Sequence, residues 1–443
     1  MASVKTVPDI KLVAKSDETR VLQSDKANHS QTSYLDGLRG VVSFIVFIRH
    51  YSLPWQESMN EGFGRGTNRS FFQLPIVRVI YSGPTAAIFF VVSGYVCSYK
   101  PIKLIRSKSP GALLYTVSST IFRRGIRLFL PPMVSTLVVM LCVQLHLYSF
   151  DYDTMPGVVS YPPTHSSTLW LQMQDWVGFL VHDLTYIWTW GVRSFDYDIH
   201  LYTIPIQFRT TMILFVTIIG LARIRTSARF SILAALFSYC MFVGRWEVAL
   251  YFSGMFLAEY NIARLESLSS DDPRGKGPFS VMKTNSTVSK VFWNCCFLCG
   301  VYLGSFPRVL GTAESTPGFI WLSHLTPNPR YWQTYAAILI VWSLDNAKFL
   351  QPMFISSYAQ YLGKISFSLY LVHGPILHVF GYAIVPAMLN ITGDDTTFHY
   401  QSGLLLGLLA LSPIVLLVAD IFNTLIDAPC ARLANWVELK LIM

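Results

Sequence analysis

The stretch at residues 402–424, SGLLLGLLALSPIVLLVADIFNT, decides the fold class of this chain. Its one charged residue is Asp420, close to its end. A helix that spans a lipid bilayer needs about 20 predominantly apolar residues, and this stretch meets that requirement. We therefore predict a transmembrane helix here, and the same criterion applies to the rest of the chain.

The composition of the whole chain agrees with a membrane protein. Of its 443 residues, 52% are hydrophobic and 13% are charged, whereas soluble domains carry about 25% charged residues. Lipid must therefore cover much of the surface. Membrane β-barrels alternate polar and apolar residues, but the apolar runs here are continuous and of helix length. We predict an all-α polytopic membrane protein with about ten transmembrane helices in one bundle.

The predicted spans lie near residues 37–53, 79–99, 129–148, 203–222, 229–243, 247–260, 290–306, 332–346, 363–386 and 402–424. The stretch at 168–190 is rich in Trp and Tyr but also carries Asp175, His182 and Asp183. We interpret it as an interfacial amphipathic helix, with a buried span as the alternative.

Charge in the loops predicts the orientation. The loop 100–128 has seven basic residues and no acidic one, whereas the loop 149–200 is mostly acidic. Basic loops face the cytosol, so we predict a polar cytosolic N-terminal tail at 1–33, a transmembrane domain at 34–436 and a cytosolic C-terminal tail at 437–443. We expect the endoplasmic reticulum or another endomembrane as the location. The sequons at Asn68 and Asn390 would be lumenal and open to glycosylation.

Ionisable side chains within a predicted span are costly and mark candidate functional sites. Arg39 and His50 lie on the same face of the first span, about 16 Å apart along its axis. Histidine titrates near neutral pH, so His50 could act as a general base deep in the membrane. Alternatively, Arg39 reaches the lipid headgroups and His50 only caps the helix end.

Further polar residues could support the same chemistry. Ser93, Gln207 and Tyr370 lie in other predicted spans, where they could donate hydrogen bonds. Three arginines precede the third predicted span. Their charge is explained by orientation alone, but they could also bind the phosphates of a donor such as coenzyme A. They are Arg123, Arg124 and Arg127. The cysteines have no neighbouring histidines, so we assign no metal site.

Five motifs, in order along nearly the whole chain, resemble the acyltransferase 3 family of membrane O-acyltransferases. Arg39, ten intervening residues and His50 match the opening motif of that family. The later motifs are similar to residues 89–95 (FFVVSGY), 123–132 (RRGIRLFLPP), 200–209 (HLYTIPIQFR) and 361–375 (YLGKISFSLYLVHGP). The segments 200–209, 316–327 and 427–429 resemble those of fungal members.

The resemblance implies transfer of an acyl group, usually acetyl from acetyl-CoA as a co-substrate, onto a hydroxyl. It implies His50 as the base and Arg39 as a residue that holds the donor, with no permanently bound cofactor. Fungal members acetylate hydrophobic secondary metabolites, such as terpenoids, meroterpenoids or polyketides, and this implies such an acceptor. Tyr202 stands where the family has Trp, and Gln207 stands where it has Glu, so a titratable group is lost.

Two other functions fit the same residues. Secondary transporters also carry intramembrane arginine and histidine within broken helices, although no paired repeat is visible here. The loss of a carboxyl at Gln207 also fits a weakened acyltransferase homologue with a binding role.

Overall fold

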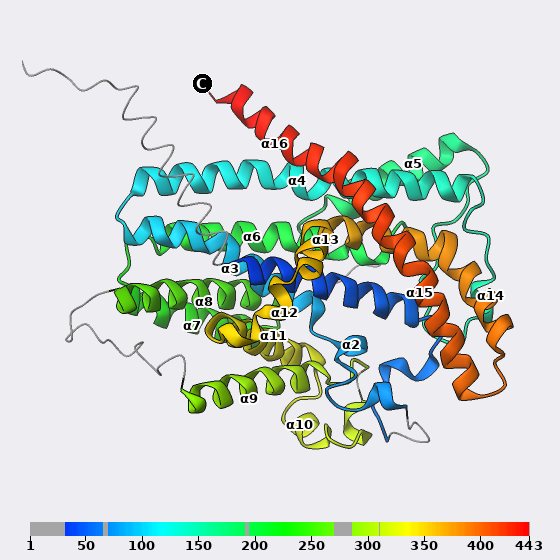
Figure 1. Cartoon of the computed structure of the whole chain (residues 1–443). Helices are drawn as coiled ribbons and strands as arrows, with labels where there is room; N and C mark the ends of the chain where they lie inside the picture. Colours follow the sequence, from blue (N-terminus) through cyan, green and yellow to red (C-terminus); the bar gives the residue numbers. More distant parts are fainter. Residues whose placement is uncertain (1–31, 65–69, 191–194, 270–285, 310, 443) are drawn as a thin grey trace, which may run out of the picture.

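The chain folds into a bundle of helices. The computed structural model describes residues 32–64, 70–190, 195–269, 286–309 and 311–442, and within these ranges it contains helices and no β-strand (Figure 1). The predicted all-α class is thus confirmed. The first helix covers residues 32–52. The later ones are α2 (Val79–Ser82), α3 (Thr85–Arg106), α4 (Pro110–Gln144), α5 (Leu169–Phe179), α6 (Thr203–Gly220), α7 (Thr226–Phe242), α8 (Trp246–Ser269), α9 (Thr287–Gly304), α10 (Ile320–Leu325), α11 (Pro329–Asn346), α12 (Pro352–Ile355), α13 (Ser357–Ile376), α14 (Tyr382–Thr392), α15 (Thr397–Phe422) and α16 (Ala428–Leu441).

Shorter turns join some of these helices. A 3-10 turn, η5 (Ile199–Tyr202), leads directly into α6. Three π-helical turns continue an α-helix instead of ending it: η4 (Leu180–Leu184) after α5, η9 (Leu377–Gly381) between α13 and α14, and η10 (Asn423–Asp427) between α15 and α16. The stretch predicted as an interfacial helix, 168–190, is thus helical over α5 and η4.

Fewer segments than the ten predicted spans meet the length and hydropathy expected of a membrane helix. In the part of the chain that the structure describes, five segments are long and apolar enough to cross a membrane: Thr85–Arg106, Pro110–Gln144, Ile199–Gly220, Ser357–Thr392 and Thr397–Leu441. The ten predicted stretches all lie largely on helices, but α7 has only 17 residues and α8 carries Glu247 and Glu259. An apolar run therefore located each helix correctly without establishing that the helix is a span.

The predicted basic loop at 100–128 is wrong. Helix α3 continues to Arg106, and α4 begins at Pro110, so only residues 107–109 separate two long helices. Pro110 is the first residue of α4, a position where its missing N–H costs nothing. The third predicted span was expected to begin near residue 129, but this position, like Pro131 and Pro132, lies inside α4. At about 52 Å, α4 is longer than the roughly 30 Å hydrocarbon core, so it also extends outside it.

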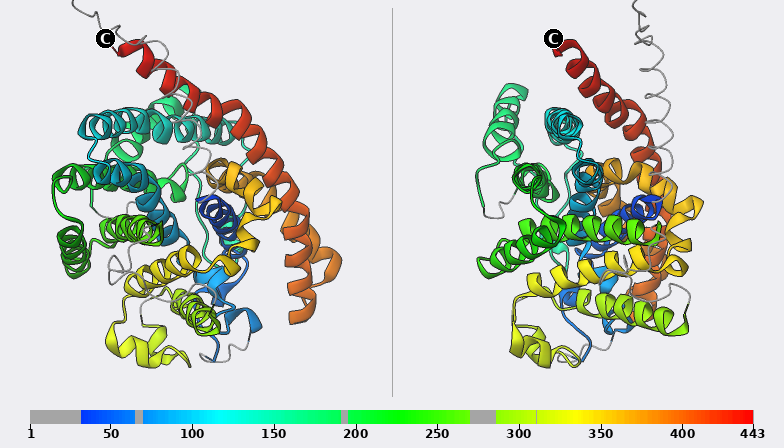
Figure 2. Two further views of the ribbon diagram at one scale, coloured as in Figure 1. Left: turned by 60° about the vertical axis from the view of Figure 1, so that its left-hand side comes forward. Right: turned by 90° about the vertical axis from the view of Figure 1, so that its left-hand side faces the viewer.

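The helix at 32–52 is surrounded by the others, as the two further views show (Figure 2). Glycines allow the closest approaches. A Cβ atom at Gly40 would lie 2.2 Å from the backbone nitrogen of Gly363 in α13, and one at Gly254 of α8 would lie 2.2 Å from the carbonyl oxygen of Val91 in α3. These helices therefore pack backbone against backbone, which small residues allow.

A buried carboxylate links four helices of the bundle. Asp345 of α11 accepts hydrogen bonds from the Tyr34 hydroxyl (2.8 Å), the Tyr95 hydroxyl (3.2 Å) and the Asn261 side-chain amide (2.7 Å). These donors belong to the helix at 32–52, α3 and α8. Because a buried carboxylate is stable only with such partners, Asp345 fixes how these helices meet.

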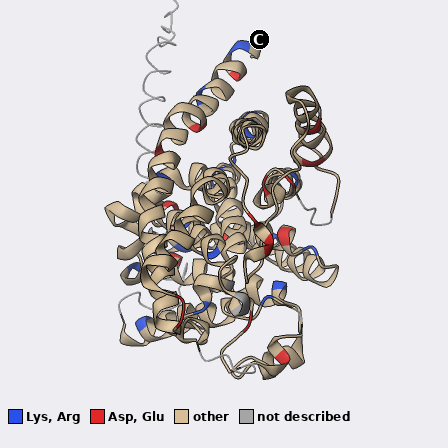
Figure 3. Ribbon diagram, turned by 90° about the vertical axis from the view of Figure 1, so that its right-hand side faces the viewer, with Lys and Arg blue, Asp and Glu red and all other residues tan. Residues whose placement is uncertain are grey.

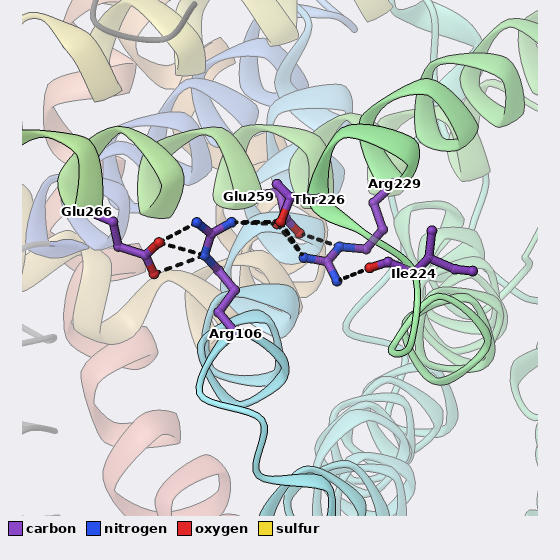
Figure 4. Close-up of polar contacts among 6 residues, drawn as sticks. All are labelled: Arg106, Ile224, Thr226, Arg229, Glu259 and Glu266. Carbon is purple, nitrogen blue, oxygen red and sulfur yellow. Dashed lines mark hydrogen bonds and ion pairs between the residues drawn. The ribbon is translucent and has the colours of Figure 1, made fainter. Parts of the chain in front are cut away.

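Charged residues are sparse along the ribbon (Figure 3), and several of them pair with each other. Arg106 at the end of α3 lies between Glu266 and Glu259 of α8, and Glu259 also accepts two hydrogen bonds from Arg229 of α7, at 2.7 and 3.0 Å (Figure 4). Arg106 and Arg229 therefore join three helices at one end of the bundle.

Candidate active site

A cavity of about 280 Å³ lies between the helix at 32–52, α3, the η5–α6 segment, α13 and η9. All five residues predicted to take part in catalysis line it: Arg39, His50, Ser93, Gln207 and Tyr370. Its other polar lining residues include Arg49, His200, Tyr202, Thr203, Arg308, Ser366 and His378. Among the described lining residues there is no aspartate or glutamate, so the walls combine apolar side chains with cationic and neutral polar groups.

Three imidazoles meet at this cavity. The ring centroid of His50 lies 3.9 Å from that of His200 and 5.5 Å from that of His373, and the rings of His200 and His373 are 4.6 Å apart. They come from three elements: the helix at 32–52, η5 and α13. His50 therefore does not act alone at the end of its helix.

Asp198 orients His200. It precedes η5, and its Oδ1 atom accepts hydrogen bonds from the backbone N–H of His200 (2.9 Å) and from Nδ1 of the same ring (2.6 Å). Burial alone would raise the pKa of Asp198, but the adjacent His200 outweighs it and holds the pKa below its ordinary value. The Oδ1 atom of Asp198 that caps η5 therefore also holds the imidazole of His200 in place.

His373 is oriented by its own helix. Its Nδ1 atom lies 3.1 Å from the carbonyl oxygen of Leu369, one turn earlier in α13. A carbonyl can only accept, so Nδ1 carries the proton. Within the described residues, the Nε2 atoms of both His373 and His200 have no hydrogen-bond partner, and both rings face the cluster.

Tyr370 supports the same cluster from α13. Its hydroxyl donates to the carbonyl oxygen of His200 and lies 2.7 Å from the Thr203 hydroxyl. Since its one proton is already engaged, Tyr370 positions η5. By contrast, Ser93 and Gln207 line the cavity without a recorded side-chain hydrogen bond in the described structure, so they can donate to a bound molecule.

The predicted cationic residues separate into two groups. Arg39 lines the cavity, 3.6 Å from Asp36 and 3.4 Å from the Ser366 hydroxyl, and Arg124 and Arg127 are its cationic neighbours. Arg124 also contacts the Cys97 sulfur and the Tyr251 hydroxyl.

Arg123 points away from this group. It donates to Asn435 (2.8 Å) and pairs with Glu438 (3.1 Å), both in α16. The structure therefore brings Arg39, Arg124 and Arg127 together and leaves Arg123 apart from them.

The sequence analysis assigned no metal site, and the histidine cluster is relevant to that assignment. One ligand atom from each of His50, His200 and His373 lies within 4.8 Å of the others, and the contact from Asp198 to His200 is of the type that orients metal-bound histidines. The residue types and their convergence would thus suit an ion such as zinc, once the rings moved closer.

The predicted site residues did not include Asp198, His200 or His373. The Asp-x-His spacing at 198–200 was a visible signal for a capped, oriented imidazole. What the sequence could not show is that this pair faces His50, which lies 150 residues earlier in the chain.

The predicted glycosylation sites differ in what the structure says of them. Asn390 is exposed in the last turn of α14, and its glycosylation stays a prediction. Asn68 lies outside the described residues.

Comparison with known proteins adds to this geometry. A family model described as an acyltransferase domain matches residues 32–424. The O-acetyltransferase PaAT-1 of Phomopsis amygdali is 32% identical, over 94% of this chain and 86% of its own length. The acyltransferase clz18 of Cochliobolus lunatus is 28% identical (90% and 94%), and the acyltransferase R4 of a Phoma species is 27% identical (91% and 95%). No solved structure matches the chain.

Proposed function

The chain belongs to the acyltransferase 3 family, and we propose that it is a membrane-bound O-acyltransferase that transfers acetyl from acetyl-CoA to a hydroxyl of a hydrophobic secondary metabolite. The observation that carries the proposal is His50, in the wall of a cavity and 3.9 Å from an imidazole that Asp198 orients. The family and the fungal relatives support acyl transfer over the secondary transporter. The relative named an O-acetyltransferase supports acetyl as the transferred group and a hydroxyl as the acceptor.

In the reaction, His50 takes the proton of the acceptor hydroxyl as its oxygen attacks the thioester carbonyl carbon. A carbon–oxygen bond forms, the carbon–sulfur bond breaks, and the coenzyme A thiolate receives the proton from His50. The positive charge that His50 carries in between is stabilised by Asp198 through His200. Ser93 and Gln207 donate to the oxyanion of the tetrahedral intermediate.

Donor binding uses the other end of the cavity. Arg39, with Arg124 and Arg127 beside it, forms a cationic region that suits the phosphates of coenzyme A. Arg123 has partners in α16, so we do not assign it to the donor. The distance of about 16 Å between Arg39 and His50 along their helix is of the order of a pantetheine arm.

The test begins with metabolite profiling of a strain that lacks this protein, in which a precursor lighter by one acetyl group should accumulate. Membranes that contain the protein should acetylate that precursor with labelled acetyl-CoA. We expect His50→Ala to lower the rate by about 10²–10⁴-fold.

The matched control is His324→Ala, since His324 is exposed in α10 and outside the cavity. A folded, membrane-inserted His50→Ala protein with the activity of this control would end the proposal.

A further inference from the structure

Two arginines in the cavity wall have no anionic partner among the residues that the structure describes. Arg49 and Arg308 both line the cavity, and Arg49 is only 7% exposed. Arg49 donates to the neutral side-chain oxygen of Asn60 (3.2 Å), while its Nε and Nη1 atoms have no partner among the described residues. For Arg308 the described structure records no hydrogen bond or ion pair, and its charged neighbours include another cation, Arg330.

In the buried arginines other than Arg49, a carboxylate or backbone carbonyl oxygens compensate the positive charge. Arg229 is paired with Glu259 at 2.7 Å, and Arg209 lies 3.8 Å from Glu247 and donates to two backbone carbonyls. Arg78 is buried but donates to three backbone carbonyl oxygens. The chain thus compensates a buried guanidinium wherever it needs one for structure, and Arg49 and Arg308 depart from that pattern.

An uncompensated guanidinium is costly to bury, because its hydration is lost without a replacement. A cavity lined by the buried Arg49 and the partly buried Arg308, without a lining carboxylate, is electrostatically suited to an anionic group. Arginine is the side chain best adapted to a carboxylate, which it can bind with two parallel hydrogen bonds.

Position separates this pair from the cations proposed for the donor. Arg49 lies ten residues after Arg39 on one helix, so the two are about 15 Å apart along its axis. Arg39 has Arg124 and Arg127 as its cationic neighbours, whereas Arg49 has Arg308 and Arg78. The cavity therefore has a cationic group at each end, with the histidine cluster beside Arg49.

We propose that the acceptor of this enzyme carries a carboxylate, which Arg49 and Arg308 bind while its hydroxyl lies at His50. This inference rests on the proposed function, because it assigns the Arg39 end to the acyl donor. The substrate class is then a hydrophobic hydroxy acid small enough for its carboxylate and hydroxyl to occupy one cavity, since Arg49, Arg308 and His50 all line it.

The experiment measures binding without turnover. The full chain in lipid nanodiscs is dialysed against 4-hydroxyphenylacetate or 3-hydroxydecanoate, and in parallel against the methyl ester of each, with protein-free nanodiscs as the background. We expect at least one acid to bind about 10–100-fold more tightly than its ester. Arg308→Gln, which breaks no recorded contact, and Arg49→Gln should each remove that preference. Arg39→Gln should keep it.

A second ligand identifies the source of the anion. Coenzyme A should bind with unchanged affinity to Arg308→Gln and Arg49→Gln and should lose affinity for Arg39→Gln. If the first two variants lose coenzyme A instead, the pair holds a donor phosphate, and the assignment to the acceptor is overturned. It is equally overturned if neither acid is preferred by the native chain, or if the preference survives in the double variant.

The two proposals fail separately. If the native chain binds the acid more tightly than its ester and Arg308→Gln does not, the carboxylate site is supported even when no acetyl transfer is found. Conversely, if the native chain and the double variant acetylate the hydroxy acid equally well, the carboxylate contact is excluded while the acyltransferase function remains.

Discussion

Replacement of Asp198 by Asn tests whether the histidine cluster works as a unit. The substitution keeps the size of the side chain and its acceptor oxygen for the backbone N–H of His200, but removes the negative charge from the 2.6 Å contact with the ring. A hydrogen bond to a charged group contributes about 1.5–3 kcal/mol. At about 1.4 kcal/mol for each factor of ten, kcat should fall by about 10–100-fold.

The assay compares acetyl transfer by Asp198→Asn with that by Asp196→Asn, an exposed carboxylate two residues earlier. Because Asp198 lies away from Arg39, the KM for acetyl-CoA should change less than about twofold, and the loss should appear in kcat. The thermal unfolding of both variants is measured to exclude a folding defect. An Asp198→Asn protein with native kcat, alongside an inactive His50→Ala protein, would refute the role of the pair.

Three further predictions concern other residues. Gln207→Glu should leave the rate within about tenfold of native if Gln207 only donates a hydrogen bond, and a larger gain would indicate a weakened enzyme. Treatment with 1,10-phenanthroline should not lower activity, since His50 acts as a base; a loss that zinc restores would make the three histidines metal ligands instead. Gly254→Ala should destabilise the protein by about 1–3 kcal/mol, because the new Cβ would meet the backbone of α3. Gly178→Ala, with no atom within 4 Å, should not, as measured by thermal unfolding in detergent.

Helix positions were predictable because apolar runs of helix length carry that information locally. The start of α4 was not, because Pro131, Pro132 and the preceding arginines have the pattern of a cytosolic helix entry. Proline is tolerated inside a membrane helix, and α4 continues through both prolines without a break.

The candidate site was predictable only in part. The spacing of Arg39 and His50 placed both on one helical face, and both line the cavity. The partners of His50 were not predictable, since η5 and α13 reach it only through the packing of the bundle. The same holds for Arg49, whose lack of a carboxylate partner is a property of the fold and has no counterpart in local sequence.

The π-helical turn η9 has a consequence for how this cavity could change during evolution. It contains His378, which lines the cavity five residues after His373. A π-turn holds one residue more than an α-turn. Deletion of a single residue there would restore α-helical geometry and redirect the side chains of the turn itself, that of His378 included, while leaving His373 in place. A one-residue insertion or deletion, rather than a series of substitutions, is therefore enough to reshape one side of the binding chamber and admit a different molecule.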